Sequence, residues 1–177
     1  MKTKNLVALS LLVGMGAVLH AVMPGFGAGM KPDMMLTMMF LGIILFPDAK
    51  SVLLLSLSTG IISGLTTTFP GGLIPNIIDK PVTAALFFGL FLLVQKFNKS
   101  MISAAVLTAV GTLISGIVFL TSAFLIVGLP GPFTVLFGLV VLPAVLVNTI
   151  TMIILYPIAQ SIMKRTNLTK QSVVIPK

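Results

Sequence analysis

The sequence has no cysteine, no tryptophan and few charged residues. Without cysteine, the chain can form no disulfide and offers no thiolate to a metal ion. Only 8% of its 177 residues are charged, whereas an ordinary soluble domain carries roughly 25%. A chain so poor in charge cannot cover itself with polar groups in water. Because 57% of the residues are hydrophobic and lie in long blocks, a lipid bilayer is the solvent that suits the chain.

Residues that carry chemistry are scarce as well. Three acidic residues and one histidine leave almost nothing for a catalytic triad or a metal site. The chain contains neither the phosphate-binding loop Gly-x-x-x-x-Gly-Lys-Ser/Thr nor the nucleophile motif Gly-x-Ser-x-Gly. The net charge of +8 comes from basic residues that stand singly or in pairs, so they form no face for nucleic acid. We therefore predict no enzyme activity, no catalytic residue, no metal and no cofactor.

The apolar blocks predict an all-α membrane protein, a single bundle of six transmembrane helices in one domain over residues 1–177. The six blocks are Leu6–Met23, Met34–Phe46, Ser51–Thr68, Pro81–Gln95, Met101–Val127 and Phe133–Met163. The first has the basic start of a signal peptide, but its 18 residues are enough to span a bilayer. The second is short for a span, so it is either tilted in a thin region or shielded by protein. The sixth is too long for one straight span, and Pro143 and Pro157 should kink or end it.

The basic residues predict the orientation of the bundle. With the N-terminus in the cytoplasm, nine Lys and Arg residues fall in inner segments and only Lys31 and Lys80 fall in outer loops. This bias follows the positive-inside rule. An even number of spans then returns the C-terminus to the cytoplasm, so both termini are predicted inside.

The predicted outer loops are rich in glycine, proline and apolar residues. They cover Pro24–Gly29, Pro70–Pro75 and Gly128–Pro132. Since a freely solvated loop need not be apolar, we interpret them as segments that fold back over the outer end of the bundle. The alternative is that they are ordinary tight turns.

The stretch from Thr66 to Pro81 collects hydroxyls, an amide, a carboxylate and an ammonium. Pro81 suits the first turn of a helix, which would place Lys80 at the cap beside free backbone N–H groups. Asp79 and Lys80 together would suit a zwitterion such as an amino acid. Alternatively, the two side chains pair with each other at the membrane surface, where such pairs contribute little. Lys31 and Asp33 allow the same two interpretations.

Two polar residues lie inside apolar blocks. Asn148 is flanked by Val147 and Thr149, and a side-chain amide in hydrocarbon needs a partner, so Asn148 should face protein. It would either bind ligand or join two helices. His20 lies near the outer end of the first block and would either pack between helices or contact ligand.

Small residues recur every four positions along the first block. Ser10 and Gly14, then Ala17 and Ala21, form a smooth face that lets another helix approach closely. The partner is either a helix of the same bundle or a separate membrane subunit.

Three segments together resemble the bacterial tryptophan transporter family. They are the opening Met1–Gly14, the segment Gly29–Leu36 and the stretch Thr66–Pro81. This family is grouped with the substrate-binding S components of energy-coupling factor (ECF) transporters. The resemblance runs over nearly the whole chain and agrees with its size and its six predicted spans.

The resemblance implies uptake of L-tryptophan across the bacterial plasma membrane. An S component captures its substrate outside, beneath the outer loops, and has no ATPase of its own. It docks onto a membrane T subunit that carries two cytosolic ATPase subunits. Docking uses an Ala-x-x-x-Ala motif on the first helix, which Ala17 and Ala21 match here, with Gly14 and Ser10 on the same face.

The resemblance also favours the polar residues as substrate contacts. The candidate site residues are Lys80, Asp79, Asn76, Thr67, Thr68, Asn148 and His20. The indole would stack against Phe and Met side chains. Its N–H needs an acceptor, and Asn148 or a threonine hydroxyl could serve.

Other functions stay open at this point. The same fold could take a vitamin or another aromatic compound. A solitary carrier driven by an ion gradient is a different class, although three acids near predicted helix ends leave few intramembrane groups to couple protons. A structural or assembly protein of the membrane is a further alternative.

Overall fold

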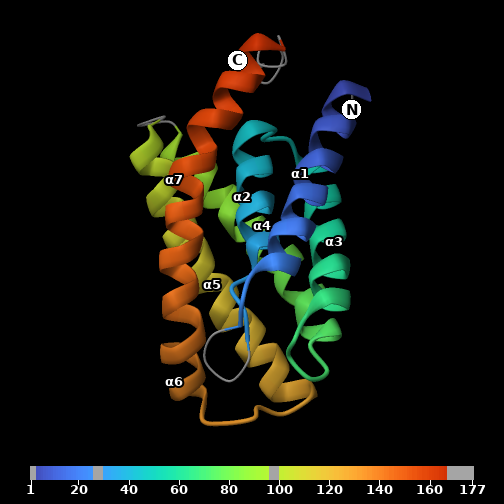
Figure 1. The fold of residues 1–177 in the computed structure, drawn as a ribbon, viewed down its shortest axis with the longest axis vertical. Coiled ribbons are helices and arrows are strands. Elements are labelled where there is room, and N and C mark those ends of the chain that lie inside the picture. The colour runs from blue at the N-terminus through green and yellow to red at the C-terminus, as the bar shows by residue number, and fades with distance from the viewer. Residues whose placement is uncertain (1–2, 26–29, 96–99, 167–177) are drawn as a thin grey trace.

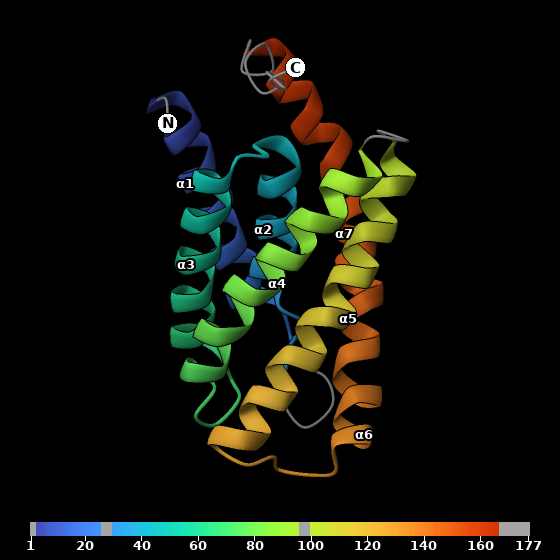
Figure 2. The same cartoon turned by 180° about the vertical axis from the view of Figure 1, so that it is seen from behind.

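The computed structural model describes residues 3–25, 30–95 and 100–166, and these fold as one bundle of helices (Figure 1). The elements are α1 (Thr3–Val22), α2 (Met34–Leu45), α3 (Ala49–Thr66), α4 (Leu73–Val94), α5 (Met101–Ile126), α6 (Phe133–Leu136), the π-helical turn η2 (Phe137–Val141) and α7 (Leu142–Arg165). Since α6, η2 and α7 follow one another without a break, the bundle has six rods (Figure 2). The described residues contain no strand, and the predicted all-α fold is confirmed.

The outside of the bundle is apolar. Five rods are long and apolar enough to cross a membrane, and large hydrophobic side chains stand out from them. Leu65, Leu125 and Val22 are 71–79% exposed. Water would penalise such a surface, whereas lipid chains match it. The chain is therefore a multi-pass protein of the cell membrane.

The short helix α2 lies in the middle of the bundle. Ten of its 12 residues are buried, and it contacts α1, α3, α4, α5 and α7. At 1.5 Å per residue it is roughly 18 Å long, too short for a hydrocarbon core of roughly 30 Å. Of the two predicted explanations, shielding by protein is the one observed.

Close packing fixes α2 against its neighbours. The rings of Phe40 in α2 and Phe87 in α4 stack with centroids 4.0 Å apart. Gly111 of α5 makes room for both rings, because a Cβ there would lie 2.7 Å from Phe40 Cζ and 2.8 Å from Phe87 Cδ2. Three helices thus meet at one point with no space left for a methyl group.

The prediction that the fourth helix begins at Pro81 is wrong. Helix α4 begins at Leu73 and contains Pro81 in its interior. Pro81 removes only one backbone bond, the one that its N–H would donate to Ile77, and membrane helices tolerate such a loss where protein surrounds them. Lys80 and Asp79 therefore lie within the helix and not at its cap. Lys80 is 2% exposed and Asp79 is fully buried. The two side chains do pair with each other, at 2.6 Å, but inside the bundle and not at the membrane surface.

The sixth rod contains both predicted prolines and continues past each of them. A π-helical turn, Phe137–Val141, comes directly before Pro143, which stands in the first turn of α7. Pro157 lies inside α7, which runs on to Arg165. Neither proline ends the helix, and the widened turn is where the backbone departs from regular α-helix.

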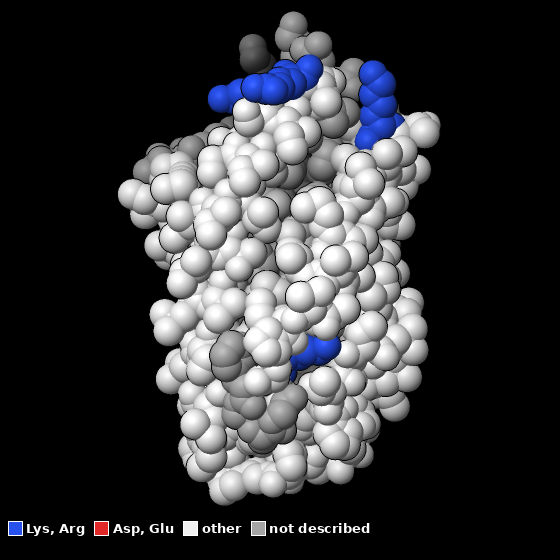
Figure 3. Space-filling model, in the orientation of Figure 1, with Lys and Arg blue, Asp and Glu red and all other residues white. Residues whose placement is uncertain are grey.

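Both described ends of the chain lie at the same end of the bundle (Figure 1). On the face in Figure 3 the Lys and Arg side chains gather at this end, with one further patch in the opposite half. An even number of rods explains the shared end. The charge bias places this end in the cytoplasm, which stays a prediction.

The predicted folding back of the outer loops is tested at one described residue of the α3–α4 connection. Phe69 is 5% exposed and its ring meets Phe119 of α5 edge to face, with centroids 5.4 Å apart. Gly71 has φ of 70° and comes close to Val127, so this connection packs against the end of α5. Most of the first outer loop, residues 26–29, lies outside the described residues.

Candidate functional site

A cavity of about 100 Å³ lies in the half of the bundle opposite the termini. A single water needs only about 10–15 Å³ by this measure, so the cavity has room for a small molecule's polar and apolar groups together. Every rod of the bundle contributes to its wall. The lining residues are His20, Met30, Lys31, Asp33, Leu36, Ser63, Thr67, Thr68, Phe69, Asn76, Asp79, Lys80, Thr112, Ser115, Gly116, Phe119, Leu120, Val140, Val141, Ala144 and Asn148.

One side of the cavity holds a buried cluster of three charges. Lys80 Nζ lies 2.7 Å from Asp33 Oδ2 and 2.6 Å from Asp79 Oδ2. It also donates to Asn76 Oδ1 at 3.3 Å. A lysine ammonium has three N–H donors, and these three partners use all of them. We call Asp33, Lys80 and Asp79 the charged triad.

Hydroxyl groups complete the bonding of both carboxylates. Asp79 accepts from Thr83 and from Ser115 of α5, each at 2.7 Å. Asp33 accepts from Ser63 of α3 at 3.1 Å and from the backbone N–H of Met35 at 3.0 Å. Asp33 thereby caps α2 while it binds α3 and α4. Buried charges persist only with such partners, so the triad also fastens four helices together.

The triad has an excess of negative charge, because two carboxylates face one ammonium. Asp79 is fully buried, whereas the Asp33 side chain is 20% exposed and lines the cavity. The excess charge is therefore accessible at Asp33. This arrangement can attract a ligand cation, such as a primary ammonium, more readily than an anion.

His20 lies beside Asp33 at the end of α1. Its Nδ1 is 3.5 Å from Asp33 Oδ1, and neither ring nitrogen makes a hydrogen bond among the described residues. The side chain is nonetheless buried, with only 5% of its surface exposed. Unmade hydrogen bonds on a buried ring are costly, so His20 is available to a ligand or to a proton.

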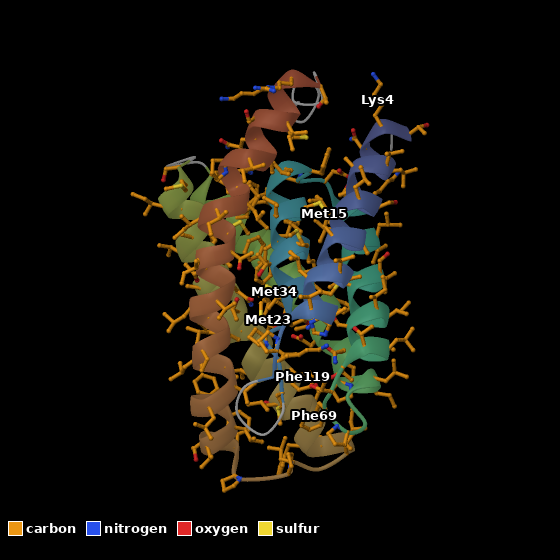
Figure 4. All side chains as sticks on the ribbon, in the orientation of Figure 1. Lys4, Met15, Met23, Met34, Phe69 and Phe119 are labelled. Carbon is orange, nitrogen blue, oxygen red and sulfur yellow. The ribbon has the colours of Figure 1, made fainter. Side chains whose placement is uncertain are left out.

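The opposite side of the cavity is apolar. It is formed by Phe69, Phe119 and Leu120 together with residues of η2 and α7. Phe69 and Phe119 lie close together in the half of the bundle away from Lys4 (Figure 4). Two rings held edge to face can receive a third aromatic ring, a contact that contributes about 0.5–1.5 kcal/mol beyond area burial.

Asn148 of α7 also lines the cavity, one helical turn after Ala144. Its Nδ2 donates to Thr112 Oγ1 of α5 at 3.3 Å, so it joins two helices as one interpretation held. Its Oδ1 has no partner among the described residues, although the residue is fully buried. A free acceptor on a residue that lines the cavity is also what ligand binding requires.

All seven residues predicted as substrate contacts line this one cavity. Sequence reasoning missed Ser63, Thr112 and Ser115, and it considered Asp33 without including it among the candidate site residues. Asp33 was predicted to pair locally with Lys31 or to bind ligand; it binds Lys80, 47 positions further along the chain. The scarcity of acidic residues could have identified Asp33 as a site residue, because each of only three acids in an apolar chain needs a partner.

The predicted docking face on α1 is largely open. Ser10, Gly14 and Ala21 are exposed and Ala17 is half-buried, and a Cβ at Gly14 would meet no atom within 4 Å. Gly16, by contrast, packs against Met35 and Met38 of α2. The bundle therefore uses one side of α1 for its own packing and leaves the small-residue side free.

Comparison with known proteins places the chain in a family. The chain matches the family "Tryptophan transporter TrpP" over residues 2–164. The chain belongs to the tryptophan transporter family. It is a transport protein rather than an enzyme.

Relatives of this family align over almost their full lengths. A "Probable tryptophan transport protein" of Bacillus subtilis (strain 168) is 62% identical over 94% of this chain and 96% of the relative. A protein of the same description from Clostridium perfringens is 38% identical over the same shares, 94% and 96%. One from Clostridium acetobutylicum is 44% identical over 88% of this chain and 91% of the relative. No solved structure matches the chain.

Proposed function

We propose that this chain takes up L-tryptophan across the bacterial cell membrane as the substrate-capturing S component of an ECF-type transporter. The assignment of the substrate rests on the cavity, whose lining combines the charged triad with aromatic and apolar residues. Tryptophan needs both, because it carries a zwitterionic end and a large indole. The names of the family and of three relatives point to the same substrate.

The charges suggest how the zwitterion is oriented. The substrate ammonium binds at Asp33, where the excess negative charge is accessible. The carboxylate then faces Lys31 and His20, the other basic side chains of the lining. Lys80 holds Asp33 and Asp79 in place, since its donors are already engaged. The indole fills the side formed by Phe69 and Phe119.

Binding can be measured directly because the chain contains no tryptophan. Its single tyrosine, Tyr156, gives little background, so bound ligand dominates the fluorescence. We expect the emission of L-tryptophan to shift to the blue when purified protein is added, because the indole leaves water. Unlabelled competitors test selectivity, with L-tyrosine and an aromatic vitamin as the comparison ligands. No shift at micromolar L-tryptophan, or stronger binding of the vitamin, would contradict the substrate assignment.

The S-component role rests on the open small-residue face of α1. Replacing Gly14 or Ala21 by leucine adds bulk to this face, so we expect binding to persist and uptake to fail. Val22 is 79% exposed, and Val22→Leu serves as the control that adds bulk to α1 at a position turned away from the face. Uptake is measured in vesicles with ATP and the partner subunits. Normal uptake by Gly14→Leu and Ala21→Leu would place docking elsewhere.

A second candidate is a carrier driven by a proton gradient. The sequence argued against it because the acids were expected near helix ends, but Asp79 is fully buried within α4 and His20 lies 3.5 Å from Asp33. These are intramembrane groups that can exchange protons. Uptake into vesicles that hold this chain alone, driven by a proton gradient without ATP, would favour the carrier over the S component.

A further inference from the structure

The apolar side of the cavity contains one polar atom that the described residues do not satisfy. Asn148 Oδ1 has no hydrogen-bond partner there, and the residue is fully buried. In the structure the amide Nδ2 donates to Thr112 Oγ1, so Oδ1 is the atom left free. Leaving a buried acceptor unpaired is unfavourable, so a ligand N–H that reaches Oδ1 gains a hydrogen bond there.

The backbone around Asn148 is shaped for close approach. The π-helical turn η2 comes just before α7, and such turns are frequent at functional sites. Gly116 of α5 lets this turn come near, because a Cβ there would clash with Val141 Cγ1. Val141 and Ala144 then line the cavity between η2 and Asn148, so a flat apolar group that enters between these helices meets Asn148.

We infer that Asn148 Oδ1 accepts the ring N–H of the substrate and thereby selects an indole over rings that lack this donor. The inference rests on the proposed function and names the residue that gives it specificity. An indole is a flat apolar group with one N–H, which matches an apolar side with one acceptor. A site built to bond a substrate N–H discriminates strongly against analogues without it, because the buried acceptor is then left unpaired.

The test compares two ligands that differ at one atom. In 3-(3-benzothienyl)-L-alanine a sulfur replaces the indole N–H with little change of shape. Affinities are measured on the purified full chain by the fluorescence of bound L-tryptophan and by competition with the sulfur analogue. We expect wild-type protein to bind the analogue about 5- to 150-fold more weakly, the range set by an unpaired buried acceptor.

Two variants separate ligand recognition from packing. Asn148→Leu should weaken L-tryptophan binding and leave the analogue nearly unchanged, so the preference falls toward one. Thr149→Val is the matched control, because Thr149 Oγ1 is also buried without a partner but Thr149 is absent from the cavity lining. It should keep the wild-type preference. Asn148→Ala provides a second variant if the leucine variant does not yield folded protein, as judged by its melting temperature in detergent.

The outcomes are distinguishable. Equal binding of both ligands by wild-type protein would overturn the inference, and so would an equal loss of both ligands in a folded Asn148→Leu protein. Failure of wild-type protein to bind either ligand would overturn the proposed function itself. A preference that disappears with Asn148 and survives in Thr149→Val supports the assignment.

Discussion

The two halves of this bundle are built differently. The half near the termini is filled by one apolar cluster that includes Leu9, Phe40, Phe87 and Met152, all fully buried. The half away from the termini has a smaller apolar cluster, around Phe69 and Leu120, and encloses the cavity and the charged triad. Tight packing in the first half leaves no room for a ligand and makes it a rigid support. The second half contains buried charges and a cavity, which make it less stable than a fully packed half. Substrate recognition requires both.

The largest effect is expected when Lys80, which binds both acids, is removed. Lys80→Met leaves Asp33 and Asp79 without their shared cation, and breaking a buried ion pair costs about 3–5 kcal/mol. We expect the free energy of unfolding in detergent to fall by that order and tryptophan binding to be lost.

A double variant sharpens the same comparison. Asp79→Asn with Lys80→Met removes one charge of each sign, and Asp33 keeps its bonds to Ser63 and Met35. Relative to Lys80→Met, stability should recover in large part while binding stays weak, because position 79 no longer holds a buried charge without its cation. Full binding by the double variant would show that Lys80 and Asp79 are structural only, because Asp33 is still present.

The next test adds one methyl group to the packed half. Gly111→Ala places a Cβ 2.7 Å from Phe40 Cζ, and overpacking of this kind costs about 1–3 kcal/mol. We expect a lower melting temperature with a normal affinity for tryptophan in the protein that folds. Gly89→Ala is the control, because a Cβ there meets nothing within 4 Å. Helix propensity alone favours alanine over glycine in both variants, so an equal change of stability in both would mean that packing around Gly111 is not what is measured.

The smallest test exchanges one ring in each half. Phe40→Leu breaks the stacked pair with Phe87, and Phe119→Leu breaks the edge-to-face pair with Phe69. Each lost ring contact contributes about 0.5–1.5 kcal/mol. In Phe40→Leu we expect this loss in the unfolding free energy, and in Phe119→Leu mainly in tryptophan affinity. The reverse assignment would contradict the division of the bundle.

Much of the candidate site could be predicted because polar residues in an apolar chain are few. His20, Asn76, Asp79, Lys80 and Asn148 each stand out against hydrocarbon, and burying them is costly unless they meet one another or a ligand. They consequently converge on one cavity. Serines and threonines escaped notice because a helix can satisfy their hydroxyls locally, as Thr108 does with Ala104.

The sequence by itself determined that the chain lies in a lipid bilayer, that it is all-helical with six rods, and which kind of residue lines the cavity. These follow from transfer free energies that add along the chain and need no knowledge of neighbours. Only the tertiary structure decided that α4 begins before Pro81, that Lys80 binds Asp33 as well as Asp79, and that Asn148 keeps one acceptor free. Those facts depend on which side chains face each other across helices. Contacts between distant segments are set by packing geometry, which local patterns do not contain.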